Sequence, residues 1–362
     1  MVTVVKSPKR KGCVGRLTCT TMKNQYYLGA YLWLFLLISA CGRQEIGPAN
    51  TTWEPSASPI DLEEIDATFI EDIAYDQYDL TRFDIFLPNS AEPTGLMIYI
   101  HGGGFTGGDK AKLYASGSQD LQELTRDLLR ANIAVATMNY RLLESGETEG
   151  VLKSLNDSRR GLQYIRSKAA DLNIDPHQIV LMGGSAGAGT SLWLATKDEM
   201  ADPGNTDPVL HESTRVKGVV LTATQSSYDI ENRWINDVFV DYGTTWEGFY
   251  AENEETVLRF YGVSSEAEYN SAEIDAYRAQ IDMLGELSVD DPEIWVDNTG
   301  SKVEAPTTTG VAYHHAFHAR EIKEYAEAAG VPVVAYYGKN PVLFEDPSGE
   351  EVADFVIRKI RE

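Results

Sequence analysis

The sequence predicts an α/β fold in which a mostly parallel central sheet carries helices on both faces. Three continuously apolar segments, residues 94–100, 133–140 and 178–183, have the length and composition of strands buried on two faces. Helical patterns at 113–131 and 151–172 separate these segments. Strands that alternate with helices favour a parallel sheet covered on both sides.

An antiparallel hairpin precedes this series, and further strands follow it. Residues 69–75 and 82–88 alternate apolar and polar side chains on either side of a turn, which is typical of paired, half-buried strands. The later predicted strands are residues 216–224, 293–298 and 331–337. We expect one domain over residues 66–362, because a chain of this length with 43% hydrophobic residues can bury one large core.

A candidate nucleophile lies where the strand at 178–183 meets the following helix. The residues there are Gly183, Gly184, Ser185, Ala186 and Gly187, which form the pattern G-x-S-x-G. At a strand-to-helix junction the glycines allow a sharp turn that lifts the serine hydroxyl above the sheet edge. The same pattern also occurs where a helix merely packs closely on a strand. The assignment of Ser185 as a nucleophile therefore depends on a second motif.

That second motif is the glycine-rich loop HGGGF at residues 101–105, which directly follows the strand at 94–100. Its N–H groups are free to point at a developing oxyanion, and the N–H of Ala186 would complete the hole. A phosphate cradle is the alternative, but the glycine patterns of phosphate-binding loops are missing. Together the motifs favour an acyl-transfer site with Gly103, Gly104 and Ala186 as oxyanion-hole donors.

With these motifs the chain resembles the α/β-hydrolase superfamily, and within it the carboxylesterases related to hormone-sensitive lipase and to bacterial feruloyl-esterase-like enzymes. The resemblance covers about residues 66–362 and rests on four segments, residues 101–110, 138–142, 159–189 and 324–337. It implies a serine carboxylesterase that acts on small or aromatic acyl esters through an acyl-enzyme on Ser185, without a metal or organic cofactor.

Residues 225–292 interrupt the alternation of strands and helices with a segment rich in aromatic and acidic side chains. In this fold an insertion at this position usually covers the active site, so we expect a helical lid. A surface decoration with its own small core is the alternative. The two differ in whether aromatic side chains of the insertion, such as Trp234 and Trp246, lie near Ser185.

The acid of a catalytic triad is expected at the C-terminal end of the strand at 293–298, where acids of this fold lie. Asp297 occupies that position, and Glu304 in the following loop is a poorer second choice. A turn-forming role is the alternative for Asp297, since aspartates are common at strand ends.

The histidine departs from the family pattern. In this fold it follows the last strand, but residues 338–360 contain no histidine. One hypothesis is a displaced base, His314 or His315, and we assign this role to His315. The position is expected to be a helix N-terminus, which disfavours the imidazolium that a base must become.

The other hypothesis is an incomplete catalytic site in a ligand-binding or scaffold homologue. A histidine within reach of Ser185 would distinguish the two. His314 and His318 lie one helical turn apart and could share a metal, but no third ligand accompanies them at a suitable spacing, so no metal site is expected.

Residues 1–41 have the character of an export signal. The apolar run at 26–40 is shorter than the ~20 residues of a membrane-spanning helix, and it ends in small residues before Cys41. This ending resembles a bacterial lipobox and implies a lipid on Cys41, with an ordinary signal peptide as the alternative. Met22 is a plausible true start. Residues 42–65, rich in Gly, Pro, Ser, Asn and Thr, are expected to form a flexible tether.

The net charge of the protein restricts the classes of partner that it can bind. The formal net charge is −24, and it becomes −30 without residues 1–40, which contain six basic residues and no acidic ones. Such a protein is repelled by nucleic acid and by anionic lipid, so membrane attachment would depend on the lipid at Cys41. Cys13 and Cys19 precede the cleavage site, so no disulfide is expected. The expected partner is a small-molecule ester, and the expected location is the bacterial cell envelope, with Gly42 favouring the outer membrane.

Overall fold

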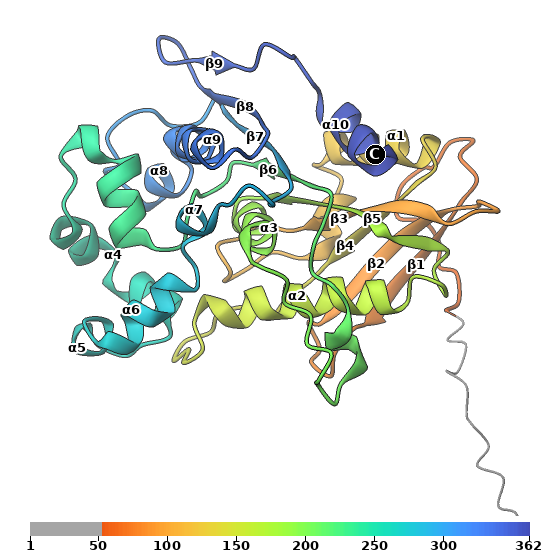
Figure 1. The fold of residues 1–362 in the computed structure, drawn as a ribbon, viewed down its shortest axis with the longest axis horizontal. Helices are drawn as coiled ribbons and strands as arrows, with labels where there is room; N and C mark the ends of the chain where they lie inside the picture. The colour runs from red at the N-terminus through yellow and green to blue at the C-terminus, as the bar shows by residue number, and fades with distance from the viewer. Residues whose placement is uncertain (1–52) are drawn as a thin grey trace, which may run out of the picture. The chain divides into compact units, whose positions relative to one another are not determined.

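The computed structural model describes residues 53–362 (Figure 1). The proposed export signal, Cys41 and the first part of the tether lie outside the described residues. Within that range, residues before the first strand contact the domain. Ser56 donates its backbone N–H to Phe69 O at 2.8 Å, and the side chain of Ile60 is buried. The tether expected to reach residue 65 therefore becomes part of the packed domain before that point.

Nine strands form one sheet in the order β1-β2-β4-β3-β5-β6-β7-β8-β9 (Figure 1). The pairs β1–β2, β2–β4 and β8–β9 are antiparallel, and the other neighbours are parallel. The strands are β1 (Ala67–Ala74), β2 (Arg82–Pro88), β3 (Thr94–Ile100), β4 (Ile133–Met138), β5 (Ile174–Gly184), β6 (Gly218–Thr222), β7 (Glu293–Thr299), β8 (Val333–Gly338) and β9 (Phe344–Glu345). The mostly parallel sheet expected from the sequence is confirmed, with the expected opening hairpin.

Helices cover both faces of the sheet. The α-helices are α1 (Gln119–Arg130), α2 (Val151–Ser167), α3 (Ala186–Thr196), α4 (Trp246–Tyr261), α5 (Glu266–Tyr269), α6 (Ala272–Ala279), α7 (Met283–Glu286), α8 (Thr309–Tyr313), α9 (Phe317–Ala329) and α10 (Val352–Arg361). Helices α1 and α10 lie together on one side, and α2 and α3 lie on the other (Figure 1). The first helix is shorter than the pattern at 113–131 predicts, because Lys110–Leu113 forms a separate 3-10 turn capped by the Asp109 side chain.

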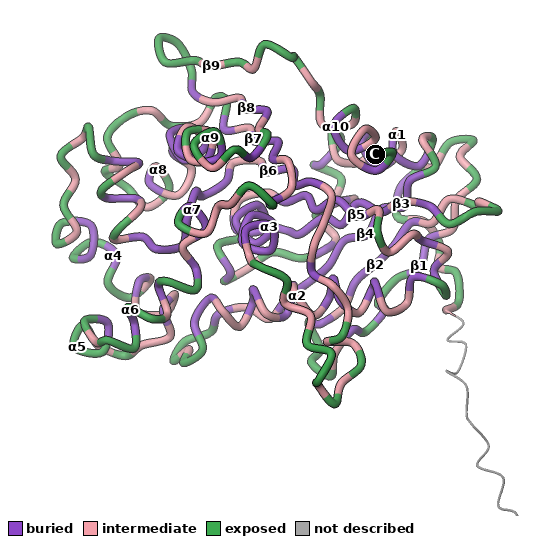
Figure 2. Tube along the Cα trace, in the orientation of Figure 1, coloured by how far each residue is buried: buried purple, intermediate pink, exposed green. Residues whose placement is uncertain are grey.

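The central strands are buried on both faces (Figure 2). In β3, Leu96, Ile98 and Ile100 join the apolar cluster that includes α2 and α3, whereas Met97 and Tyr99 join the cluster under α1 and α10. This division follows from strand geometry, since successive side chains point to opposite faces. It also explains why the strand has no polar alternation.

The C-terminal ends of β3, β5, β6 and β7 meet at one edge of the sheet, because these strands are parallel neighbours. The glycine loop at 101–105 follows β3, and Ser185 follows β5. The insertion at 225–292 leaves the same edge after β6, and it is helical, since it contains α4 to α7. This edge therefore collects the chain segments that carry the candidate site.

Candidate active site

Ser185 sits at a strained turn between β5 and α3. Its backbone angles are φ 54° and ψ −120°, a left-handed conformation that L-residues adopt at a cost. The glycines on either side make the turn possible by close contact. A Cβ on Gly183 would lie 2.2 Å from Gly187 C, and a Cβ on Gly187 would lie 1.9 Å from Ile100 O. The strand-turn-helix geometry predicted for a nucleophile elbow is therefore present.

The three predicted oxyanion-hole donors lie at the turn and in the loop after β3. Gly103 and Gly104 have φ values of 120° and 60°, and a Cβ on Gly103 would lie 2.1 Å from Gly107 O. Only glycine fits this backbone. Ala186 is the first residue of α3, so its N–H has no intrahelical acceptor. The positive end of the α3 dipole lies at the same place.

Buried side chains hold the glycine loop from behind. The hydroxyl of Tyr140 donates to His101 O at 2.9 Å, and the Tyr140 and His101 rings stack with centroids 4.4 Å apart. His101 Nδ1 lies 2.7 Å from Gly102 O, and burial lowers the pKa of His101. His101 is therefore a neutral structural group of the loop.

His314 is the histidine that reaches the serine. Its Nε2 lies 2.9 Å from Ser185 Oγ, although 129 residues separate the two. His314 caps the C-terminal end of α8, and α9 begins only at Phe317. The histidine thus does not sit at the helix N-terminus that the sequence pattern suggested. A helix C-terminus favours a positive charge, although α8 is short.

The environment of His314 favours neutral imidazole. Burial lowers its pKa below the ordinary value, and a hydrogen bond with the backbone of Gly310 opposes this shift. A proton held on Nδ1 leaves Nε2 free to accept the serine proton.

The structure does not bring His315, the assigned base, to the serine. The His315 side chain is buried among the rings of Phe239, Tyr242 and Phe317, and its Nδ1 accepts from the Phe317 N–H at 3.2 Å. Burial lowers its pKa to about 4. His314 faces the site, whereas the side chain of the next residue, His315, points into the core.

His318 is a second buried histidine with a structural role. Its Nδ1 lies 3.2 Å from Ser226 N and its Nε2 lies 2.9 Å from Ala312 O, so both ring nitrogens have partners. Burial lowers its pKa to about 3. Among residues 53–362, no group of three or more His, Cys, Asp or Glu side chains is arranged to hold a metal ion.

Asp297, the assigned acid, is bound elsewhere. It lies within β7, and its Oδ1 accepts from the Thr299 N–H at 2.6 Å. Glu304 likewise accepts from its neighbour Val303 and pairs with Lys339 at 3.5 Å. Neither carboxylate contacts a histidine in the described part of the chain. The turn-forming alternative fits Asp297 better than the triad role.

The next residue, Asn298, was not singled out from the sequence but connects the site's segments. Its buried amide accepts from Thr224 N at 2.9 Å and donates to Thr224 O and to His315 O at 3.1 and 3.2 Å. Gln225 adds a second link by donating to Tyr313 O at 2.7 Å. These bonds fix the histidine segment against the end of β6. Successive side chains of a strand point to opposite faces, so Asn298 points into the core if Asp297 points outward. This alternation is the sequence signal that could have identified Asn298.

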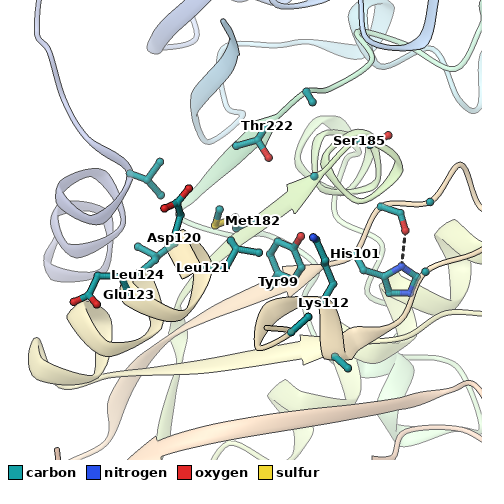
Figure 3. A pocket seen from close by; sticks show the side chains of 18 of the residues that line it. Tyr99, His101, Lys112, Asp120, Leu121, Glu123, Leu124, Met182, Ser185 and Thr222 are labelled. Atoms are coloured by element: carbon teal, nitrogen blue, oxygen red, sulfur yellow. Dashed lines mark hydrogen bonds between the residues drawn. The ribbon is translucent and has the colours of Figure 1, made fainter. Parts of the chain in front are cut away.

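Two cavities meet at Ser185. The larger has a volume of about 1240 Å³ and runs from Ser185 along the glycine loop to α1 and the start of α10. Figure 3 looks into it, with Ser185 and His101 at one end and Asp120 and Glu123 of α1 at the other. The smaller has a volume of about 230 Å³ and is lined by aromatic side chains: Phe105, Tyr228, Trp234, Phe260 and Tyr313.

The insertion contributes to the smaller cavity directly. Tyr228, Trp234 and Phe260 belong to residues 225–292 and line the same space as Ser185, whereas Trp246 does not line it. The Tyr228 hydroxyl donates to Ala186 O at 2.9 Å, which attaches the insertion to the first turn of α3. The insertion therefore packs against the candidate site rather than apart from it. In the described range, no helix has both the length and the apolar character that crossing a membrane requires.

Parts of the chain are similar in sequence to known esterases. Residues 83–233 match the BD-FAE family model. The chain is 28% identical over 145 residues to a probable isoprenylcysteine alpha-carbonyl methylesterase of Arabidopsis thaliana, covering 40% of this chain and 28% of that protein. It is 32% identical over 107 residues to a chlorogenic acid esterase of Aspergillus niger, covering 28% of this chain and 20% of that protein. These matches thus span less than a third of the curated relatives' length.

A solved structure covers more of the chain. A truncated carbohydrate esterase from gut microbiota superposes with a TM-score of 0.59, covering 83% of this chain and 99% of that one, at 17% sequence identity. At this identity the similarity concerns the fold alone.

Proposed function

The chain is a carboxylesterase-like α/β-hydrolase, and from that premise we propose that it hydrolyses carboxylic esters through an acyl-enzyme on Ser185, with His314 as the general base. The observation that carries this proposal is the 2.9 Å contact between Ser185 Oγ and His314 Nε2. This distance lies within the range in which a base takes a proton from a nucleophile. The elbow and the glycine loop supply the rest of the machinery.

The reaction follows from these positions. His314 Nε2 takes the hydroxyl proton while Ser185 Oγ bonds to the ester carbonyl carbon, and the N–H groups of Gly103, Gly104 and Ala186 stabilise the resulting oxyanion. The bond to the alcohol then breaks, and the imidazolium gives its proton to the departing alkoxide. A water molecule repeats the two steps on the acyl-enzyme, releasing the acid and restoring the serine.

The proposed machinery is a dyad oriented by the main chain. No carboxylate contacts His314 in the described residues, and we propose that the Gly310 backbone, which opposes the lowering of the His314 pKa, takes the place of the usual acid. A carbonyl can hold the correct tautomer, but it stabilises imidazolium less than a carboxylate does. We therefore expect turnover slower than that of a full triad.

The two cavities would bind different parts of the ester. The small aromatic cavity accommodates the acyl group, because its volume of about 230 Å³ is below the ~300 Å³ of a small drug-sized pocket. A short chain or a single ring fits this space. The open cavity of about 1240 Å³ accommodates the alcohol, which can be much larger. The similarity to a chlorogenic acid esterase supports an aromatic acyl group.

A non-catalytic ligand-binding role is the second candidate. The observation that favours it is the missing carboxylate at His314, since members of this fold normally use three residues. Both cavities would then bind a ligand without turnover.

Hydrolysis of p-nitrophenyl butyrate by the purified protein distinguishes the two roles. We expect saturable turnover that Ser185→Ala reduces to near background, because the oxyanion hole alone retains only a small part of the rate enhancement. Equal, near-background rates for both proteins would instead support the binding role. An unrelated surface serine variant, Ser348→Ala, serves as the matched control.

We also propose where in the cell the protein is located. The apolar run at 26–40 and Cys41 support an exported protein anchored by a lipid to the bacterial cell envelope, with the insertion acting as a lid over the pocket. The acidic net charge of −24 supports lipid attachment rather than electrostatic binding to a membrane.

A further inference from the structure

The small cavity beside Ser185 contains one arginine, Arg259. This residue lies on the last turn of α4, and it lines the cavity together with Thr256, one turn earlier, and Tyr313. Burial raises the pKa of Tyr313 to about 12, and the charge of Arg259 opposes part of this rise. Arg259 and Tyr313 thus line the same cavity, whose other walls are largely aromatic.

The Arg259 guanidinium has no carboxylate within ion-pair distance in residues 53–362. The other arginines of the insertion behave differently, since Arg233 pairs with Asp282 at 2.6 Å and Arg278 pairs with Asp229 at 2.9 Å. Arg259 is half-buried, and its guanidinium is free to form hydrogen bonds with an anion that enters the pocket.

Three acidic residues near Arg259 do not pair with its guanidinium. Glu147, Glu255 and Glu268 line an adjoining cavity that Arg259 also borders. Glu147 is paired with Lys153, and Glu268 accepts from the Ser264 N–H at 2.8 Å. Glu255 lies one turn before Arg259 on α4, but it forms no ion pair with it in the described structure.

We propose that Arg259 selects esters whose acyl group carries a second carboxylate, that is, monoesters of short dicarboxylic acids. The proposal rests on the proposed function, because it places the acyl group in the small cavity. The free carboxylate accepts hydrogen bonds from the guanidinium, which matches the planar geometry of a carboxylate with two N–H donors. The ester carbonyl at the other end of the chain then meets Ser185.

The charge on the opposite side of Ser185 fixes this orientation. The large cavity is bordered by one basic side chain, Lys112, and by five acidic ones: Asp109, Asp120, Glu123, Asp127 and Glu351. Figure 3 shows Asp120 and Glu123 on α1, at the end of the cavity away from Ser185. A carboxylate is repelled there and attracted to Arg259, so the charged end of the substrate belongs on the acyl side. The alcohol leaves through the acidic cavity.

A pair of esters that differ only in the terminal charge tests the proposal. Monoethyl glutarate ends in a carboxylate, and ethyl pentanoate ends in a methyl group at the same position. We expect Arg259→Gln to lower the ratio of kcat/KM values, charged over neutral, by about tenfold to a hundredfold, mainly through KM. Arg259→Lys should retain part of the preference, because it keeps the charge without the planar pair of donors. Glu255→Gln is the matched control on the same helix and should not lower the ratio.

A binding measurement separates this proposal from the proposed function. Monoethyl glutarate is titrated into Ser185→Ala protein by calorimetry, with and without Arg259→Gln. Binding that weakens about tenfold or more supports the role of Arg259, even if neither ester is hydrolysed by the unmutated protein. Equal binding in both proteins, no binding in either, or an unchanged kcat/KM ratio would overturn it. Turnover of ethyl pentanoate alone would leave the proposed function intact.

Discussion

His314 Nε2 and Ser185 Oγ form a hydrogen bond of 2.9 Å between two segments that leave the same edge of the sheet. The serine follows β5 and the histidine follows β7, whereas the fold's usual histidine follows the last long strand. The segment that normally carries the acid thus provides the base. Its carboxylates, Asp297 and Glu304, bind backbone N–H groups instead.

Asp297→Asn is expected to leave esterase activity within about threefold of the unmutated protein. In a triad, the same change costs about 10⁴ in kcat, because the histidine loses its correct tautomer. Here the Asn oxygen can still accept from the Thr299 N–H, so the strand end is preserved. The measurement is kcat for p-nitrophenyl butyrate. A loss of three or more orders of magnitude would show that Asp297 serves the histidine.

Asn298→Ala, one residue further on, is expected to have the larger effect. The substitution leaves the Thr224 and His315 backbone groups without their buried partner, which costs about 2 to 4 kcal/mol in the free energy of unfolding. It also loosens the segment that carries His314, so kcat should fall more than KM rises. Urea unfolding together with kcat measures both effects. An active, fully stable variant would contradict this positioning role.

The buried histidines predict loss of stability in mild acid. Burial lowers the pKa of His315 to about 4 and that of His318 to about 3, while unfolded histidines titrate near ~6.5. Above pH ~6.5 both states are neutral and the histidines have no effect on stability. As the pH falls from ~6.5 towards 4, only the unfolded state gains protons. Each histidine then lowers the free energy of unfolding by up to about 1.4 kcal/mol per pH unit.

His315→Asn provides the comparison for this pH dependence. Its amide oxygen can accept from the Phe317 N–H as Nδ1 does, but it does not titrate. The slope of unfolding free energy against pH between 6.5 and 4.5 should be smaller in the variant, and common contributions from other groups cancel. Identical slopes in the two proteins would mean that His315 is not buried in its neutral form.

Cys41→Ser is expected to release the protein from the membrane or to leave an uncleaved precursor. The reason is that diacylglyceryl transfer requires the Cys41 thiol, which resembles that of a lipobox. Fractionation of an expressing bacterium, with mass spectrometry of the mature N-terminus, checks this. An unmodified N-terminus at any residue other than Cys41 would exclude the lipid anchor.

The architecture could be predicted from the sequence, because the features that indicate it lie within single strands and loops. Two-face-buried strands such as 94–100 are continuously apolar, and the glycines around Ser185 and at 101–105 are required by backbone geometry. These features do not depend on where distant segments pack. The order of strands and the meeting of loops at one edge then follow from parallel pairing.

The residues that contact Ser185 could not be predicted from the sequence, because the choice between two neighbouring residues depends on the direction in which each side chain points. Asp297 and Asn298 point to opposite sides of β7, and His314 and His315 diverge where α8 ends before α9. The sequence pattern suggested a helix N-terminus at this position, so it could not indicate which neighbour faces the serine. Arg259 was missed for a similar reason, since its pocket is formed by segments far apart in the chain.

The most direct measurement is kcat/KM for p-nitrophenyl butyrate as a function of pH, compared among unmutated protein, His314→Gln and His315→Asn. Because burial lowers the pKa of His314, activity should rise through a midpoint below pH ~6.5 as the imidazole becomes neutral. His314→Gln should lose at least about three orders of magnitude and the acidic limb, whereas His315→Asn should retain both within about threefold. Loss of activity in His315→Asn with turnover preserved in His314→Gln would contradict the assignment of His314 as the base.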